Sequence, residues 1–576
     1  MNQALQLKLP LSARRLTPYL GLVLIMGLWL TVAFRPSETA TAAGRGVAGR
    51  VIDSQGEPVG DAELRLYVND ESEAVAETYS QPDGAYLLVL REDETVSSVR
   101  VEVERPHFET YTWIPGQAEL EILLEDGSFV THDVVLIRRI VASFWIIAAI
   151  FLGMLAVIAT ERLHNTLAAL LAMVLIFAIS QLGGSINPDL FVFTFEQALE
   201  HVDFEVIFLL LGMMIVIGVI EETGIFQWLA YQAYRLSRGK IWLLQIILMS
   251  ITATASALLD NVTTMLLITP IILELALAAG IKPLSLVLPA LLAANVGGLA
   301  TLIGTPVNIM IGSFVGLSFN DFVLNLTPGV IAALVGLMIF VQLRYWKEYH
   351  TTGAGLSPAL MKQLEENGRI RDVINLRKAG IVFGVVLVLF VLGEQFHLSP
   401  AISAIAGAVA MLLWVSPDIQ DMMSVVDWTT LVFFIGLFIV VGAVQEVGLL
   451  ALSADWIGRV VGENLLAALL AIVWMAALVS GMVDNIPFAA AMLPVVKFLT
   501  RTIPGAENHS LYYGLAIGAD LGGNSSLIGS SANLVVAGIT ERAGYKITFR
   551  KFLHIGLPAT AITTAIGCLW LIIHFM

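Results

Sequence analysis

The sequence predicts an all-α polytopic membrane protein with two inverted repeats, each containing a re-entrant hairpin and a broken helix, and with a small exported β-sandwich domain. Three observations lead to this fold class: an apolar composition, motifs that occur twice within the apolar part, and one polar segment with strand-like alternation. Hydrophobic residues make up 57% of the 576 residues and charged residues 14%, far from the average of soluble globular proteins. Most of the chain is therefore expected to lie in a lipid bilayer.

Three motifs recur in the same order and with nearly constant spacing. The recurring segments, first copy and then second, are 203–224 and 427–448, 256–270 and 480–494, and 295–308 and 520–533. Within them SALLDNVTTMLLITP becomes SGMVDNIPFAAAMLP, and NVGGLATLIGTPVN becomes DLGGNSSLIGSSAN. A duplicated membrane domain whose polar motifs interrupt apolar segments is typical of secondary transporters, in which the binding site lies between the halves.

Changes in composition divide the chain into five parts. These are a membrane anchor or signal segment at 1–43, the exported β-sandwich at 44–137, a first repeat at 138–346, a cytoplasmic linker at 347–378 and a second repeat at 379–576. The apolar run of the first part follows Arg14 and Arg15, as in anchors and in cleaved signal peptides, and its length favours an anchor. In either case the next segment is exported.

The segment 44–137 consists of short alternating stretches separated by turn-forming Gly, Pro and Asp residues, the pattern of a small β-sandwich. Its phrases GRVIDSQGEPVGDAEL and QPDGAYLL resemble the carboxypeptidase-regulatory-like domain, whose members are usually structural or binding modules. The segment contains no Cys and no cluster of His and Asp, so no chemistry is assigned to it.

Beyond residue 138, a series of apolar stretches is expected to cross the membrane. They lie near 140–160, 165–182, 204–221, 284–315, 324–345, 379–393, 400–415, 428–445, 509–540 and 552–575. Two further segments, 241–275 and 464–497, have Asp-Asn at a polar midpoint, and each half is expected to be too short to cross a core of about 30 Å. Lys240 and Lys282 flank the first of these and should both be cytoplasmic, so the chain enters and leaves by one face. This predicts a re-entrant hairpin whose tip is buried against protein or water.

Loop charges predict the orientation. The basic residues assigned to the cytoplasmic side are Arg235, Arg238, Lys240, Lys282, Arg344, Lys347, a cluster at 362–378, and Arg542, Lys546, Arg550 and Lys551. Loops near 183–203, 316–323 and 394–399 contain no Lys or Arg and are assigned to the outside. Asp203 is then outside and Asp427 inside, so the two repeats run in opposite directions.

The hairpin tips contain the first candidate binding residues. They are Asp260, Asn261, Thr263 and Thr264 in the first repeat and Asp484 and Asn485 in the second. Hard oxygen ligands of this kind suit a small cation such as Na⁺, and carboxylates within a membrane are usually functional. The alternative is that Asp and Asn only cap the second half-helix of each hairpin.

The third motif pair places Gly, Pro and Asn inside long apolar stretches, which predicts helix breaks near Gly304–Pro306 and Gly529–Ser531. Carbonyl groups at such breaks can bind a cation, and the following helix N-terminus favours an anion. The candidate residues are Gly304, Thr305, Asn308, Gly529, Ser530 and Asn533, with Asp520 in the place of Asn295. The expected Na⁺ ligands are Asn261, Gly304, Asn485 and Gly529. For the glycines at 297, 298, 522 and 523, close helix packing is the alternative.

Several function classes are disfavoured. The single Cys568 supports neither an internal disulfide nor a cysteine metal cluster, and the His residues lack metal-binding spacing. No GxxxxGK[ST] motif is present, so ATP-driven transport by this chain alone is not expected. Neither enzymatic activity, a cofactor other than Na⁺ or H⁺ as coupling ions, nor a nucleic-acid partner is expected.

The motif SALLDNVTTMLLITP followed by NVGGLATLIGTPVN closely resembles the ion transporter superfamily with its citrate-transporter-like domain. Within it, the sequence is similar to the branch of arsenite permeases, NhaD-type sodium/proton antiporters and the melanosomal P protein. The resemblance extends over 138–576 and implies inverted repeats, two re-entrant hairpins, two broken helices and usually a homodimer with a scaffold and an elevator-like transport domain. In related dicarboxylate carriers the hairpin tips are Ser-Asn-Thr. The tips Asp260-Asn261 and Asp484-Asn485 depart from this, which counts against citrate or succinate as the substrate.

The expected function is secondary active transport of a small inorganic ion or a small anion, driven by Na⁺ or H⁺, with cation/proton exchange ahead of Na⁺-coupled anion transport. The reason is electrostatic, because Asp260, Asp484 and Asp520 should converge on one cavity that attracts cations. A membrane-anchored binding or sensor protein, in which the β-domain is the active part, is the alternative from a different class. The expected location is a bacterial inner membrane, with residues 44–137 external or periplasmic.

Overall fold

The computed structural model describes residues 45–351 and 368–576, apart from positions 55, 70–72, 91–96, 125–127, 161, 451, 454–458, 460–461 and 463. The expected anchor or signal segment at 1–43 and half of the expected linker, residues 352–367, lie outside the described residues. The chain divides after Arg138 into two compact units, and each unit is described by itself.

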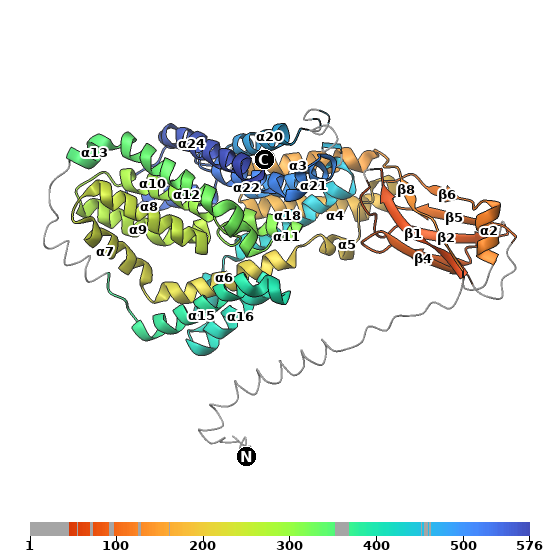
Figure 1. Ribbon diagram of the computed structural model, residues 1–576, viewed down its shortest axis with the longest axis horizontal. Helices are drawn as coiled ribbons and strands as arrows, with labels where there is room; N and C mark the ends of the chain where they lie inside the picture. The colour runs from red at the N-terminus through yellow and green to blue at the C-terminus, as the bar shows by residue number, and fades with distance from the viewer. Residues whose placement is uncertain are drawn as a thin grey trace, which may run out of the picture. The chain divides into compact units, whose positions relative to one another are not determined.

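The N-terminal unit contains two four-stranded sheets (Figure 1). Its elements are β1 (Arg45–Asp53), β2 (Glu63–Val68), β3 (Ala76–Tyr79), β4 (Ala85–Leu90), β5 (Val99–Glu104), β6 (Tyr111–Trp113), α2 (Gln117–Leu124), β7 (Phe129–Thr131) and β8 (Val134–Leu136). One sheet has the order β4-β1-β7, with β8 also paired to β1, and the other has the order β3-β2-β5-β6. Strand β1 runs antiparallel to β4 and parallel to β7 and β8. Alternate side chains of both sheets, such as Val51 of β1 and Leu64 of β2, form one buried cluster.

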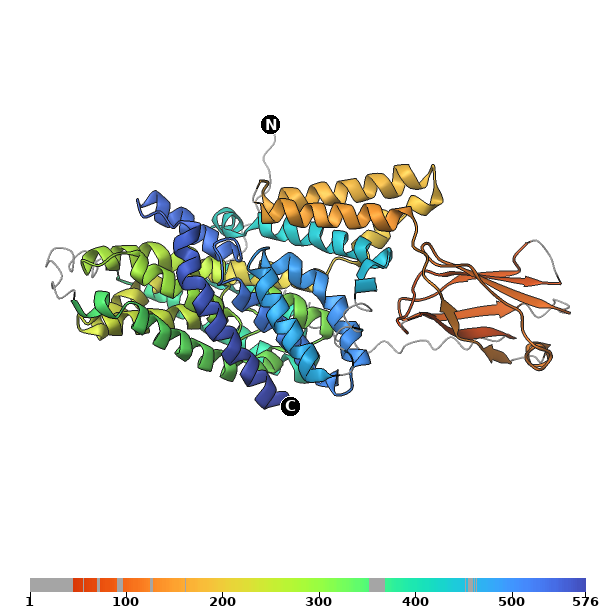
Figure 2. The ribbon, with the colours of Figure 1, turned by 90° about the horizontal axis from the view of Figure 1, so that it is seen from above.

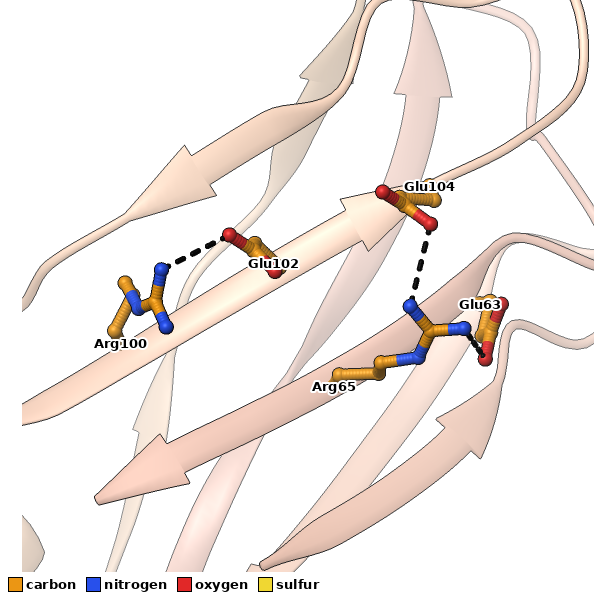
Figure 3. Close-up of polar contacts among 5 residues, drawn as sticks. All are labelled: Glu63, Arg65, Arg100, Glu102 and Glu104. Carbon is orange, nitrogen blue, oxygen red and sulfur yellow. Dashed lines mark hydrogen bonds and ion pairs between the residues drawn. The ribbon is translucent and has the colours of Figure 1, made fainter. Parts of the chain in front are cut away.

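The opposite face of the second sheet carries charged side chains in register (Figure 3). Arg65 of β2 lies between Glu63 and Glu104, with Arg65 Nη1 3.3 Å from Glu104 Oε2. On β5, Arg100 Nη1 is 3.1 Å from Glu102 Oε1. Exposed ion pairs of this kind add little stability. They do give this face the polarity of a surface that contacts water.

The C-terminal unit is mostly helical, as expected of an integral membrane protein. Among the described residues, nine helices are long and apolar enough to cross a membrane. They are α3 (Ala142–Ala159), α4 with η1 (Asn165–Gly183), α6 (Phe204–Glu222), α8 (Ile241–Leu258), α9 (Asn261–Ala278), α12 (Phe319–Arg344), α15 with η3 (Val373–Phe396), α18 (Trp428–Glu446) and α24 (Phe549–Phe575).

Further helices complete this unit. Those that pack among the long helices are α10 (Leu284–Gly298), α11 (Pro306–Val315), α16 (Pro400–Trp414), α20 (Leu465–Ser480), α21 (Asn485–Thr502), α22 (Ser510–Gly522) and α23 (Ser531–Arg542). The connecting ones are η2 (Pro188–Leu190), α5 (Phe195–Glu200), α7 (Ile225–Ser237), α13 (Trp346–Thr351), α17 (Ile419–Val425) and η4 (Ala506–Asn508).

Helix packing in this unit is duplicated, both within each half and between the halves. Helix α8 packs against α10, and α20 packs against α22. Likewise α6 packs against α16, and α18 packs against α4, which lies beside α3 and α18 in Figure 2. Equivalent glycines allow the second pair of contacts, because a β-carbon at Gly212 would lie 2.6 Å from the Ala404 carbonyl carbon and one at Gly436 would lie 3.2 Å from Ala169 Cβ. The duplicated sequence therefore forms duplicated helix contacts.

Both predicted helix breaks are present. Helices α10 and α11 are separated by residues 299–305, and α22 and α23 by residues 523–530. Pro306 begins α11 at the first helical position, where its missing N–H leaves no hydrogen bond unmade. At both breaks the chain leaves the helix at a glycine-rich stretch, as the sequence predicts.

The hairpin halves are longer than expected. Helices α8 and α9 each have 18 residues and meet the length and composition of a membrane span, because α9 continues past Pro270 to Ala278. The expectation that each half is too short to cross is therefore wrong for α8 and α9. A helix of this length measures about 27 Å, so length alone does not distinguish a re-entrant hairpin from two spans, and the hairpin remains a prediction based on the flanking lysines.

Candidate functional site

The two Asp-Asn motifs each begin the second helix of their hairpin. Asp260 is the N-cap of α9, where Oδ1 accepts from Thr263 N at 2.9 Å and Oδ2 from Thr263 Oγ1 at 2.5 Å. Asp484 is the N-cap of α21 and accepts from Ile486 N at 3.1 Å. The capping alternative therefore holds in both repeats. Each carboxylate keeps lone pairs that can accept from, or bind to, other partners.

The structure brings both hairpin tips to one cavity of about 560 Å³. Its polar lining consists of Arg162, His164, Asn165, Thr166, Asp260, Thr263, Asp427, Thr429, Thr430, Asp484 and Ser531. The predicted convergence is therefore present for Asp260 and Asp484, whereas Asp520, which was expected to join them, does not line this cavity. Carboxylates from three helix N-termini face one space in which water and small ions fit.

Asp427 lines this cavity although its place in the sequence indicated only a membrane end. It is the N-cap of α18 and accepts from Thr430 N at 3.1 Å. Its counterpart Asp203 caps α6 in the same way, accepting from Val206 N at 3.2 Å, but does not line this cavity. The recurrence of the motif shows the cap, and only the tertiary fold shows which copy faces the cavity.

Asn165 is a site residue that the sequence did not indicate. Its Nδ2 donates to Asp484 Oδ2 at 3.2 Å, from the first turn of α4 to the second hairpin. The neighbouring Arg162 and His164 bring positive or titratable groups to the same cavity wall. A polar run, ERLHN, between two apolar spans was the available signal, and it is equally typical of an ordinary loop.

Next to the hairpin tips, four asparagines form a buried network between the two repeats. Asn261 Nδ2 donates to Asn295 Oδ1 at 2.9 Å. Asn295 Nδ2 donates to Asn524 Oδ1 at 2.8 Å and to Asn533 Oδ1 at 3.2 Å. Asn295 thereby links the tip of the first hairpin to the broken helix of the second repeat.

The equivalent residues form a second, different cluster. Asn485 Nδ2 donates to Asp520 Oδ1 at 3.1 Å, as Asn261 does to Asn295. Asp520 Oδ2 accepts from Thr305 Oγ1 at 2.8 Å. Asp520 stands in the second repeat where Asn295 stands in the first. Its carboxylate therefore lies between the repeats, and the residue is only 3% exposed.

Asn308 and Asn533 stabilise the helix breaks through their amide groups. Asn308 Nδ2 donates to Thr301 O at 2.8 Å and Leu299 O at 3.2 Å. Asn533 Nδ2 donates to Gly523 O and Ser526 O, both at 2.8 Å. Since these carbonyl groups already accept hydrogen bonds, they are less available to a cation than the sequence suggested.

The glycines at the breaks make close backbone contacts. A β-carbon at Gly297 would lie 2.2 Å from Ala253 O, and one at Gly522 would lie 2.6 Å from Ala477 O. A β-carbon at Gly304 would lie 2.2 Å from Gly298 O, and one at Gly529 would lie 2.9 Å from Gly523 O. The packing alternative therefore holds for the glycines at 297, 298, 522 and 523. Cation binding by Gly304 and Gly529 remains a prediction.

The remaining candidate residues are Thr305, Ser530 and Thr264. Thr305 is the N-cap of α11 and accepts from Asn308 N at 3.3 Å. Ser530 is the N-cap of α23 and makes no side-chain cap hydrogen bond. Thr264 is fully buried, and its Oγ1 has no hydrogen-bond partner among the described residues.

The citrate transporter (CitMHS) family model matches residues 155–512. Over 427 residues the chain is 36% identical to an uncharacterized transporter of Mycobacterium bovis, which covers 74% of this chain and 97% of that protein. It is 32% identical to the human P protein over 504 residues, covering 74% of this chain and 59% of that longer protein. The solved structure of MtrF, an antimetabolite efflux pump of Neisseria gonorrhoeae, has a TM-score of 0.50 at 11% identity over 75% of this chain and 95% of that one. The last likeness concerns the fold alone.

Proposed function

Because the chain belongs to the citrate transporter family, we propose that it is a secondary active transporter that exchanges a small cation, Na⁺ in the first instance, for protons across the membrane. The observation that carries this proposal is the single cavity lined by Asp260, Asp484 and Asp427. Membership of the family implies transport. The choice of cation exchange depends on the charges in the cavity.

The cavity favours cations because carboxylates outnumber the cationic groups that line it. Carboxylates on three helices, against Arg162 and the titratable His164, attract cations and repel multivalent anions unless cations bind first. In the proposed cycle Asp260 and Asp484 are neutralised in turn by Na⁺ or a proton. A neutralised site can change the side of the membrane that it faces at lower cost than a charged one.

The proposal places the coupling-ion sites at the hairpin tips and helix breaks. The hairpin tip and the helix break are adjacent within each repeat, since Asn261 binds Asn295 and Asn485 binds Asp520. The oxygens proposed for Na⁺ are those of Asn261 and Gly304 in one half and Asn485 and Gly529 in the other. Two inverted repeats, each with one such arrangement, are a basis for alternating access.

One observation favours a second candidate, Na⁺-coupled transport of an organic anion or oxyanion. Arg162 and His164 line the same cavity, and an Arg side chain is suited to binding carboxylate or oxyanion groups. Under this alternative, cations bound at the hairpin tips would offset the carboxylates before the anion enters.

The remaining features of the proposal concern the assembly. The transporter is placed in a bacterial inner membrane, as a homodimer, with the two N-terminal sheets forming an external sandwich. The sheets form their own unit up to Arg138, which suits a separately folded module. No enzymatic step and no cofactor other than Na⁺ and H⁺ are included.

The test is transport by purified protein in liposomes with imposed Na⁺ and pH gradients and with candidate anions in parallel. Cation exchange predicts Na⁺-driven proton movement without any anion, whereas the second candidate requires the anion. Deletion of residues 44–137 should preserve transport. The transporter proposal is wrong if the intact protein moves no ion under these gradients. If deletion of residues 44–137 also abolishes whatever activity the protein has, the chain is a sensor or binding protein.

A further inference from the structure

The two clusters between the repeats are equivalent in position but not in chemistry. In one, Asn295 Nδ2 donates to Asn533 Oδ1 at 3.2 Å. In the other, the equivalents are Asp520 and Asn308, and an ionised carboxylate has no hydrogen to donate. The duplication therefore pairs a donor with an acceptor on one side and two acceptors on the other.

Asp520 and Asn308 belong to the same local cluster. Thr305 Oγ1 donates to Asp520 Oδ2 at 2.8 Å and accepts from Asn308 N at 3.3 Å. The amide orientation of Asn308 is set by its Nδ2, which faces Thr301 O and Leu299 O. Its Oδ1 therefore lies on the side of the amide group opposite Thr301 O and Leu299 O.

The Oδ1 atom of Asn308 lacks a partner. Asn308 is fully buried, and no donor among the described residues reaches this oxygen. The equivalent oxygen of Asn533 does accept a hydrogen bond, from Asn295. An unpaired buried acceptor beside a buried carboxylate is costly, and a bound cation would satisfy both groups.

The serines that precede the two hairpin tips show the same asymmetry. Ser480 Oγ donates to Ala519 O at 2.5 Å. Its equivalent, Ser256, is fully buried, and its Oγ has no hydrogen-bond partner among the described residues. Ser256 lies close to Thr305, since a β-carbon at Gly298 would be 3.2 Å from Ser256 Oγ and 2.8 Å from Thr305 Cγ2. The unsatisfied oxygens of Asn308 and Ser256 thus both belong to residues near Thr305, which donates a hydrogen bond to Asp520.

We propose that one Na⁺-sized cation binds between the Asp520 carboxylate and Asn308 Oδ1, and that the equivalent position is closed by the hydrogen bond from Asn295 to Asn533. This inference rests on the proposed function and deepens it. This site is additional to the two coupling-ion sites proposed above. The duplicated fold forms it only once, because Asp520 takes the place of Asn295 in the second repeat.

The test is the thermal unfolding midpoint of the purified full-length protein in detergent, titrated with NaCl at constant ionic strength with choline chloride. A ligand that binds only the folded state raises this midpoint with concentration. Wild-type protein should show the rise. Asp520→Asn should be more stable without Na⁺, because its amide can donate to Asn308, and should bind Na⁺ more weakly by about tenfold or more, the scale of one charged ligand. The control Asp372→Asn removes a surface carboxylate that caps α15 and should respond like wild type.

A second variant keeps the proposal testable if Asp520→Asn does not fold. Asn295→Asp recreates the acceptor pair on the other side, so the midpoint should rise more steeply with Na⁺ than in wild type. A wild-type Na⁺ response in folded Asp520→Asn would overturn the site, as would an unchanged slope in Asn295→Asp or a response of wild type to pH without any response to Na⁺. Because this assay needs no transport, Na⁺ binding without flux would contradict the proposed function and leave the site intact.

Discussion

Asn485 donates a hydrogen bond to Asp520 across 3.1 Å, so the tip of the second hairpin is attached to the end of α22, where the broken helix is interrupted. The first repeat makes the equivalent contact from Asn261 to Asn295 at 2.9 Å. In each half, the hairpin tip and the broken helix are therefore expected to move together. A substitution at either end of these bonds should affect ion binding and hairpin position at once.

The hairpin asparagines are predicted to contribute to the Na⁺ dependence of transport. Asn261→Ala and Asn485→Ala should each raise the Na⁺ concentration needed for half-maximal flux, because each removes an oxygen that apolar surroundings do not replace. Flux in liposomes at varied Na⁺ measures this. Asn320→Ala, which removes a contact to Val391 O at the start of α12, is the matched control. Wild-type Na⁺ dependence in both folded hairpin variants would leave these residues with a purely structural role.

The hairpin aspartates are predicted to carry the exchanged charge. Asp260→Asn and Asp484→Asn should fold, since Asn is as good an N-cap as Asp, but should lose Na⁺/H⁺ exchange because a neutral side chain cannot alternate between two cations. Proton flux driven by a Na⁺ gradient is the measurement. Asp418→Asn alters the N-cap of the surface helix α17 and should exchange normally. Normal exchange in both hairpin variants would move the anion-transport alternative ahead.

The membrane path of the hairpins is predicted from their flanking charges. In a Cys568→Ser background, Lys240→Cys and Lys282→Cys should react with a membrane-impermeant thiol reagent only from the cytoplasm. Gly462→Cys and Arg501→Cys should react only from outside. Reaction of positions 240 and 282 from opposite faces would make α8 and α9 two full spans, which their length allows, and would end the inverted-repeat model.

Close packing at the helix breaks predicts that a methyl group is not tolerated at Gly297. Gly297→Ala would place a β-carbon 2.2 Å from Ala253 O, and such overpacking costs about 1–3 kcal/mol. At Gly384 in α15 nothing lies within 4 Å of a β-carbon, so Gly384→Ala should be neutral or gain about 0.5–1 kcal/mol from lower chain entropy. Thermal unfolding of the two variants in detergent compares them. Equal stability would remove the packing role of Gly297.

The N-terminal unit is predicted to lose stability in acid through His132. This ring stacks on Trp113 with centroids 4.2 Å apart, and its Nε2 lies 3.2 Å from the Tyr111 hydroxyl. Burial lowers the pKa of His132, although the carboxylates of Glu119 and Asp133 oppose this shift. The unfolded chain, with a His pKa of about 6.5, then binds the proton more readily than the folded unit, so stability is full above about pH 6.5 and falls as the pH drops through that value toward the lower folded pKa.

Hydrogen exchange of β6 and β8 in the full-length protein, compared above and below about pH 6.5, measures this loss. After correction for intrinsic exchange rates, protection should fall on the acid side in wild type. His132→Phe retains an aromatic ring and removes the titrating group, so its protection should not change with pH. The same acid loss in this variant would assign the effect to other groups.

Local signals in the sequence determined the elements of the site. The glycines and Pro306 placed the helix breaks, because Gly leaves helical geometry at little steric cost and Pro suits the first helical position. The Asp residues at 260 and 484 placed the helix starts, because a short carboxylate satisfies free N–H groups there. The duplication of these signals also indicated that the site would be formed twice.

Only the tertiary structure decided which of these residues meet. Asn165 reaches Asp484, Asn295 reaches Asn533, and Thr305 reaches Asp520. Each of these contacts joins segments that lie far apart in the chain, and side-chain type alone does not specify the partner. The same holds for Asp427, which is the N-cap of its helix as Asp203 is, but whose helix packs so that it faces the cavity. A local pattern sets backbone geometry, whereas the packing of whole helices sets which polar groups share a buried space.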